Sequence, residues 1–179
     1  MTDTPARKAG NRFIPFLYFT LFTAGGIAMS LAAPTLSAIQ DLVGNLNREN
    51  VRTKGALEKT LGLVLEEDEG TSIFSFWKTE NKEVGGLKIT ELSYREPREG
   101  AGAVAGAHLI MRLANDGCVG RNELLAAYPE MQITAPPAPE NPDPLQSYQQ
   151  ETASALLSFG FSLDGEECLG KIVFSLKNP

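Results

Sequence analysis

Few side chains in this chain have the chemistry for metal binding or nucleophilic catalysis. Its 179 residues include one histidine, His108, and two cysteines, Cys118 and Cys168. A metal site built from several histidine and cysteine ligands is excluded by counting alone. We therefore expect no metal and no cofactor.

The two cysteines are the only pair that an intramolecular disulfide could join. A bridge between Cys118 and Cys168 would close a loop of about 50 residues and would stabilise the fold by about 4 kcal/mol in the chain-entropy model. A catalytic thiol is the alternative, but the chain has no CxxC motif and His108 is poorly placed in the sequence to serve it. We predict the disulfide, with Cys168 on the inward face of its strand.

His108 and three carboxylates are the candidates for acid–base catalysis. The segment around His108 alternates so that this side chain lies on the outer face, and spacing supplies it with no acid or nucleophile. Glu91, Asp116 and Glu123 could meet in the fold as the paired carboxylates of a hydrolase. The chain has no GxSxG, HExxH or P-loop motif, and its glycine-rich segment 100–106 precedes a strand-like run instead of opening a helix. We predict no catalytic residue and no enzymatic activity, with a small hydrolase as the less favoured alternative.

The overall charge argues against one class of partner. The formal net charge is −6, and the 16 lysines and arginines are scattered through the chain. A nucleic-acid-binding protein normally concentrates positive charge in a stripe or patch. We therefore expect no nucleic-acid partner.

A long apolar stretch near the N-terminus predicts export. From Phe13 to Ala33 the residues are apolar or weakly polar, a length that crosses a hydrocarbon core as a helix. Positive charges precede this stretch, and the first charge after it is Asp41, which places the N-terminus in the cytoplasm and the remainder across the membrane. A buried helix of a water-soluble protein is disfavoured by these flanks. The preceding basic residues are Arg7, Lys8 and Arg12.

Whether this stretch remains as an anchor or is cleaved stays open. Its length exceeds the apolar core of about 7–15 residues in a typical signal peptide, which favours an anchor. The small residues at 30–33 fit a cleavage site. The expected localisation is the cell envelope, as a single-pass inner-membrane protein or, after cleavage, as a periplasmic or secreted one. The expected segments are 1–12 (cytoplasmic, basic), 13–35 (transmembrane anchor or signal peptide), 36–52 (juxtamembrane helix and linker) and 53–179 (exported domain).

The spacing of apolar residues predicts the elements of that domain. Helical spacing is found from Leu36 to Glu49, at 53–65 and at 121–128. Strand-like alternation is found at 71–77, 86–94 (with a bulge), 103–113, 131–134, 154–163 and 168–176. We interpret the acidic run 66–69 as a solvated linker and the proline-rich segment 135–144 as an exposed loop.

The order of these elements predicts an α+β fold. An N-terminal hydrophobic helix would precede helices packed on an antiparallel sheet. Residues 53–114 and 118–177 each contain a helix followed by strands, so two tandem helix–β-meander units are a further hypothesis.

Two families show a similar order of elements. The order across 53–176 resembles that of the BamE-like outer-membrane assembly lipoproteins and of the β-lactamase inhibitor protein family. This resemblance implies a non-catalytic protein that binds another protein through the open face of a sheet. The stretch 25–41, GGIAMSLAAPTLSAIQD, resembles the end of a type IV pilin membrane helix, which implies a filament subunit with one unbroken helix to about Leu61. Arg12 and Leu17 differ from the glycine and glutamate expected in a pilin.

These observations favour a non-catalytic, exported envelope protein that binds a protein or envelope component. It would also contact the membrane through 13–35 if that segment is not cleaved. A type IV pilin-like structural subunit is the alternative. Because exposed aromatic side chains on a sheet are natural protein contacts, we expect Trp77, Tyr94 and Tyr148 to contact the partner.

Overall fold

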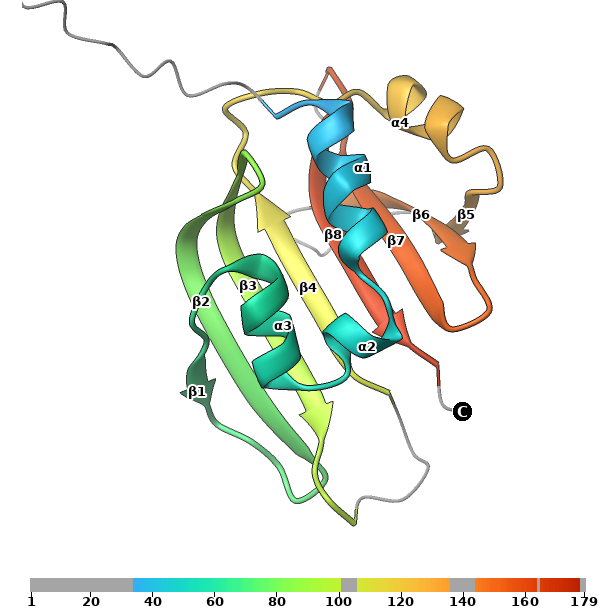
Figure 1. Cartoon of the computed structure of the whole chain (residues 1–179). Coiled ribbons are helices and arrows are strands. Elements are labelled where there is room, and N and C mark those ends of the chain that lie inside the picture. Colours follow the sequence, from blue (N-terminus) through green and yellow to red (C-terminus); the bar gives the residue numbers. More distant parts are fainter. Residues whose placement is uncertain (1–33, 101–105, 136–143, 164, 178–179) are drawn as a thin grey trace, which may run out of the picture. The chain divides into compact units, whose positions relative to one another are not determined.

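An antiparallel sheet of eight strands organises the part of the chain that the structure describes (Figure 1). The structure is a computed structural model, and it describes residues 34–100, 106–135, 144–163 and 165–177. The strands follow the spatial order β1-β2-β3-β4-β8-β7-β6-β5, and every neighbouring pair is antiparallel. Their bounds are β1 (Glu66–Asp68), β2 (Phe74–Val84), β3 (Leu87–Pro97), β4 (His108–Leu113), β5 (Gln132–Ala135), β6 (Leu145–Glu151), β7 (Ala155–Ser162) and β8 (Leu169–Leu176).

Short helices cover one face of this sheet and leave the other face without a described helix. In Figure 1 the first three helices lie in front of the strands, and side chains of all four helices join the core on that side. The helices are α1 (Leu36–Asn45), α2 (Arg48–Val51), α3 (Lys54–Leu61) and α4 (Arg121–Ala127).

Capping residues divide the first helical region into three pieces. The Thr35 hydroxyl accepts a hydrogen bond from the backbone N–H of Ala38, and Asn47 and Thr53 cap α2 and α3 in the same way. The backbone is extended at Asn47 and Thr53, so no helix runs unbroken to Leu61. Gly62 ends α3 in the left-handed conformation (φ 67°), which suits a residue without a Cβ atom.

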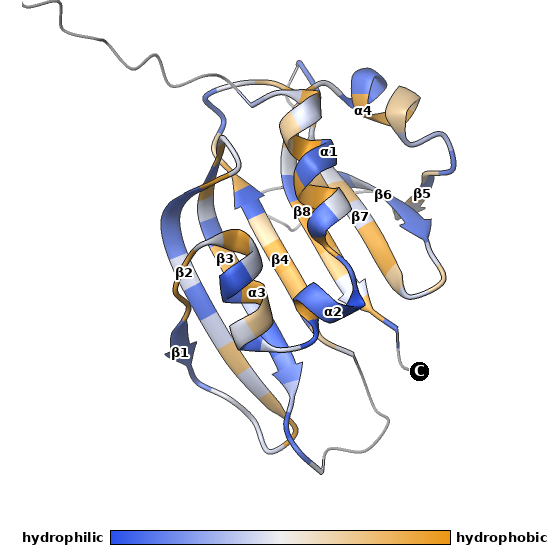
Figure 2. Cartoon of the chain, viewed as in Figure 1, coloured by the Kyte–Doolittle hydropathy of each residue, from blue (hydrophilic) through white to orange (hydrophobic). Residues whose placement is uncertain are grey.

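One cluster of buried side chains fills the space between the helices and the sheet. Ile39 of α1 and Leu57 of α3 are fully buried in it, as are Leu109, Phe159 and Ile172 of three different strands. Figure 2 shows the alternation of hydrophobic and hydrophilic residues along the strands that this one-sided burial requires. Full burial of a large apolar side chain stabilises a fold by about 1.5–3 kcal/mol, so this cluster holds the helices on the sheet.

The predicted bulge in β3 is confirmed. The pairing of β3 with β4 shifts between Ile89 and Glu91, and the residues that face the core change from Leu87 and Ile89 to Leu92 and Tyr94. An extra residue in a strand reverses the faces of everything beyond it. The helix at 121–128 and the hairpin of β7 and β8 are also found close to their predicted positions.

The predicted fold class is wrong in its balance of elements. Strands take 46% of the described residues and helices 22%, so the fold is one large antiparallel sheet with few short helices. The units proposed at 53–114 and 118–177 do not form separate sheets, because their last strands, β4 and β8, pair with each other. The segments with helical spacing form helices of only 4 to 10 residues. The predicted helical segments were longer, so the prediction overstated the share of helix.

Several strands escaped prediction because their residues are polar. The acidic run predicted as a linker forms edge strand β1, and β2 continues to Val84 through the segment KTENKE, which was expected to end it. Strand β6, with the sequence LQSYQQE, was not predicted at all. Backbone pairing with a neighbouring strand supplies the hydrogen bonds in these segments, and it needs no apolar pattern.

The folded domain includes residues that precede the predicted boundary at 53. Ile39 of α1 and Val51 of α2 are fully buried in the common core, so 36–52 is part of the folded unit and not only a linker. Val64, which lies within the helix predicted at 53–65, is 72% exposed, because the helix has already ended at Leu61 and Leu65 takes the buried position.

Four expectations fall wholly or mostly on residues outside the described ranges. The segment predicted to be cytoplasmic, 1–12, lies wholly outside them, and of the predicted anchor or signal peptide at 13–35 only 34 and 35 are described. Most of the glycine-rich segment 100–106 and of the proline-rich segment 135–144 lies outside as well. Within the described ranges, no helix has the length and apolar character needed to cross a membrane.

Candidate functional site

The face of the sheet opposite the helices is the candidate binding surface, and we call it the free face. Its side chains come from alternate positions of β2, β3, β4, β8, β7 and β6, and the strand register arranges them in three rows that cross the sheet. The rows are Phe76–Arg95–His108–Ser175–Leu156–Glu151, Lys78–Ser93–Ile110–Val173–Ser158–Gln149 and Glu80–Glu91–Arg112–Lys171–Gly160–Ser147.

The middle row places apolar side chains at the centre of the free face. Ile110 of β4 lies directly opposite Val173 of β8, and serines flank the pair at Ser93 and Ser158. All four residues are half-buried, and none of the described helices or strands covers them. The centre is therefore a shallow apolar surface bordered by small polar side chains.

Aromatic rings and an arginine lie at the β2 end of the first row. The rings of Phe74 and Phe76 meet edge to face with centroids 6.4 Å apart. The guanidinium of Arg95 lies 5.0 Å from the centre of the Phe74 ring. Its Nε atom is buried and has no hydrogen-bond partner within the described residues. The contact with the Phe74 ring therefore comes with a desolvation cost at this nitrogen.

His108 is the residue on this face that comes closest to a catalytic arrangement. Its Nδ1 atom lies 2.6 Å from the Ser175 hydroxyl oxygen, and the two side chains share a hydrogen bond. Burial and then the nearby charge of Arg95 lower the pKa of His108, so the ring is neutral at pH 7. A histidine that acts as a base needs an acid to orient its second nitrogen, and among the described residues no carboxylate bonds to this ring. His108 and Ser175 therefore form a polar contact between the paired strands β4 and β8.

The three candidate carboxylates lie apart. Glu91 pairs with Arg112 at 3.2 Å on the free face, and Asp116 pairs with Lys88. Glu123 is exposed on α4, which packs on the other face of the sheet. The first two have separate cationic partners, and the arrangement is not that of a paired-carboxylate site.

The disulfide between Cys118 and Cys168 is present, as predicted. It joins the loop before α4 to the start of β8, where the Leu169 N–H also donates to the Val119 carbonyl at 3.0 Å. The expected inward position of Cys168 is wrong. Leu169 is buried instead, because the pairing of β7 with β8 shifts between Gly160 and Phe161 and changes which residues face the core.

The only group of three metal-ligand residues in the described part of the chain lies at this disulfide. The ligand atoms of Cys118, Glu166 and Cys168 lie within 4.8 Å of one another. Because the two sulfurs are bonded to each other, neither is a thiolate that could hold an ion. The group is a structural crosslink beside an exposed carboxylate.

The aromatic residues expected to contact a partner lie on the covered face. Tyr94 is 1% exposed, and its hydroxyl donates a hydrogen bond of 2.9 Å to the Val51 carbonyl. Burial, with Glu96 nearby, raises the pKa of Tyr94 far above its usual value. Trp77 packs against the core with the Lys54 ammonium 5.0 Å from its ring centre, and Tyr148 is buried against Phe161. None of the three contributes to the free face.

The residues that do form the free face were missed, although the sequence contains a signal for them. Phe74 and Phe76 alternate with Ser75 and the partly buried Trp77, and Ile110 alternates with the buried Leu109 and Met111. Once one face of a strand is assigned to the core, its alternate residues belong to the other face. An apolar residue at such an outward position is the signal.

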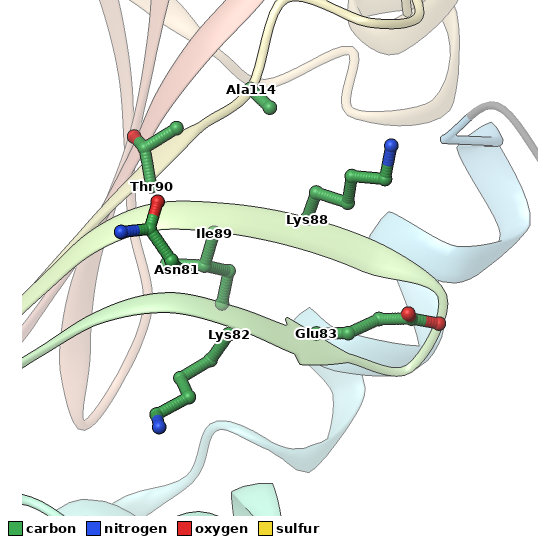
Figure 3. A pocket seen from close by; sticks show the side chains of 7 residues that line it. All are labelled: Asn81, Lys82, Glu83, Lys88, Ile89, Thr90 and Ala114. Atoms are coloured by element: carbon green, nitrogen blue, oxygen red, sulfur yellow. The ribbon is translucent and has the colours of Figure 1, made fainter. Parts of the chain in front are cut away.

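Two hollows lined by described residues contain no catalytic constellation. One of about 270 Å³ lies where the register of β2 and β3 skips Asn81 and Thr90, and both residues line it (Figure 3). In Figure 3 the charged ends of Lys82, Glu83 and Lys88 point in different directions, so no charged group converges on the hollow. A second hollow, beside β5 and β6, is lined mainly by glutamine and glutamate side chains. Neither joins a nucleophile to a base.

Comparison with known proteins gives no relative for this chain. No protein-family model matches it, and neither does any curated protein or solved structure.

Proposed function

We propose that this is a non-catalytic, exported protein of the cell envelope that binds a protein or envelope component through the free face. The observation that carries this proposal is the half-buried apolar centre of that face, at Ile110 and Val173, with no described element over it. Apolar surface at the centre and polar side chains around it are the usual composition of a protein-binding patch.

Two other features support the proposal. The Cys118–Cys168 disulfide fits an oxidising compartment, which agrees with the export expected from the apolar stretch that begins at Phe13. The break between α1 and α2 at Leu46 and Asn47 favours a compact binding domain over a pilin-like subunit, for which one helix would continue to Leu61.

A photo-crosslinking residue placed on each side of the sheet tests this function. We would replace Ser158, on the free face, with a photo-reactive amino acid in the full chain and irradiate intact cells. Lys59, exposed on α3, is the matched control on the helix side. We expect a discrete crosslinked species of higher mass from position 158 and none of the same mass from position 59.

The opposite pattern would show that the free face is not the contact surface. A species that forms only from position 59 would assign the contact to the helices. If neither position gives a discrete species, at any protein level that the cells tolerate, the binding function itself is contradicted.

A further inference from the structure

The two central strands of the free face present two cations directly opposite each other. Arg112 of β4 and Lys171 of β8 are partners in the strand register. Side chains at such positions are close neighbours, and like charges there destabilise the pair of strands. Arg112 has a carboxylate within reach, since its Nε atom lies 3.2 Å from Glu91.

Lys171 has no such compensation. No described carboxylate forms an ion pair with its ammonium, and its neighbour on β7 is Gly160. A Cβ atom added at Gly160 would lie 3.3 Å from the Lys171 Cβ and 3.1 Å from Leu145 Cδ1, so the site has little room for a larger residue. Lys171 therefore lies between a second cation and a position that carries no side chain.

An apolar pair adjoins this cationic pair. Ile110 and Val173 occupy the next row of the free face, two residues along β4 and β8 from Arg112 and Lys171. The four side chains form a small block, with positive charge at one end and apolar surface at the other. Arg95 adds a further cation in the row beyond.

We propose that the free face binds a protein segment that carries a carboxylate next to an apolar side chain. The carboxylate lies between Arg112 and Lys171, where it relieves the repulsion between the two cations, and the apolar side chain packs on Ile110 and Val173. This inference rests on the proposed function and specifies the partner's chemistry. Charge complementarity is its basis, because an acidic group is the one that this pair of cations attracts.

The same residues argue against a membrane surface or another continuous polyanion as the partner. Glu80 and Glu91 lie in the same row as Arg112 and Lys171 and would repel an extended negative surface. A protein segment can place one carboxylate on the cations and keep its other charges away from the two glutamates. Binding of a single carboxylate therefore fits a face with both positive and negative side chains better than binding of an extended negative surface.

A displayed library of random twelve-residue peptides, selected on the purified full chain in mild detergent, tests the inference. We expect the enriched peptides to carry Asp or Glu beside Leu, Ile, Val or Phe. One enriched peptide, synthesised, should bind Lys171→Glu roughly tenfold more weakly than the unaltered chain, because charge pairs at interfaces have effects of this order. Lys59→Glu makes the same charge change on α3 and should bind the peptide as the unaltered chain does.

A second peptide, with the acidic residue exchanged for its amide, shows whether the peptide's negative charge causes the difference. It does so on the unaltered protein, so a folding defect of a variant cannot explain the result. This exchange should weaken binding to the unaltered chain by a similar factor and should have little further effect on Lys171→Gln. Lys171→Gln also removes the charge without reversing it, so a loss of binding shared by both Lys171 variants, at an unchanged melting temperature, is not due to misfolding.

Other outcomes overturn the inference in distinguishable ways. Enriched peptides without acidic residues that Val173→Asp no longer binds would reject the acidic partner and leave the binding function in place. Binding to vesicles of phosphatidylglycerol that requires Lys171, with no peptide dependent on it, would assign the site to lipid. If no free-face variant affects any enriched peptide, both the inference and the proposed function fail.

Discussion

The two faces of the sheet use the same strands for different purposes. In β4, Leu109 and Met111 face the helices and are fully buried, whereas His108, Ile110 and Arg112 alternate with them and remain half-buried on the free face. The covered face is mainly apolar and fills the space beneath the helices. The free face mixes charge, small side chains and apolar surface, which is the composition that recognition requires.

This contrast separates stability from function in a testable way. Substitutions on the covered face should change the free energy of unfolding, because the side chains there pack against helices. Substitutions on the free face should change it little and should act on binding instead. Each of the following experiments compares the two faces or the contacts that hold the helices in place.

The largest effect is expected at Phe159. Its ring is fully buried and meets the Tyr128 ring edge to face at 5.2 Å. Phe159→Ala should lower the free energy of unfolding by about 3–5 kcal/mol, because it removes buried surface and leaves a cavity. Ser158→Ala, at the adjacent free-face position, should change it by no more than about 0.5 kcal/mol. Urea unfolding of the three proteins measures both values, and equal losses would contradict the contrast between the faces.

Loss of the disulfide should have the next largest effect. Replacing Cys118 and Cys168 together with alanine should lower the free energy of unfolding by about 2–4 kcal/mol, because the unfolded chain gains conformational freedom. Thermal unfolding with and without a reductant provides the comparison. The unaltered protein should lose stability when it is reduced, and the double variant should not respond. A double variant as stable as the oxidised protein would refute a structural role for the bridge.

The buried hydrogen bond of Tyr94 should contribute less. Tyr94→Phe leaves the buried Val51 carbonyl without the hydroxyl that donates to it, and should cost about 1–2 kcal/mol. Tyr128→Phe is the control, since the Tyr128 hydroxyl makes no hydrogen bond within the described ranges, and should change stability by less than about 0.5 kcal/mol. Chemical unfolding of both variants measures the difference. A Tyr128→Phe loss as large as that of Tyr94→Phe would show that the hydrogen bond is not the cause.

The smallest effect is a pH dependence on the free face. The pKa of His108 is lowered in the folded protein, by burial first and by Arg95 second. Between that lowered pKa and the ordinary value of about 6.5, the unfolded chain binds more protons, so stability is full above this window and falls as the pH falls through it. The chain has one histidine, so His108→Asn should remove this dependence between pH 7.5 and pH 5.5.

Unfolding free energies at these two pH values, for both proteins, give the slope. A slope that is unchanged in His108→Asn would assign the pH dependence to other groups. The carboxylates of Glu58, Asp68 and Glu151 also have lowered pKa values, but they lose their contribution at lower pH.

The sequence predicted the local features that depend on neighbouring residues. The hairpin of β7 and β8, the helix near 121–128 and the bulge in β3 were all predicted from the spacing of apolar side chains. The disulfide followed from a count, because Cys118 and Cys168 had no other partner. Prediction failed where a strand has no apolar pattern of its own. The polar strands β1 and β6 gain their hydrogen bonds from β2 and β7, and nothing in their own composition indicates it.

The candidate site was the least predictable part. Alternation could place Arg112 and Lys171 on outward faces, but not on the same row. Their proximity depends on the pairing of β4 with β8, which joins the two halves of the chain.

The sequence alone therefore determined the short-range elements, because side-chain periodicity reflects neighbours a few residues apart. It also determined the disulfide, because two cysteines leave one possible pair. The tertiary structure decided which face carries the helices and which cations meet, because strand pairing across the whole chain sets both.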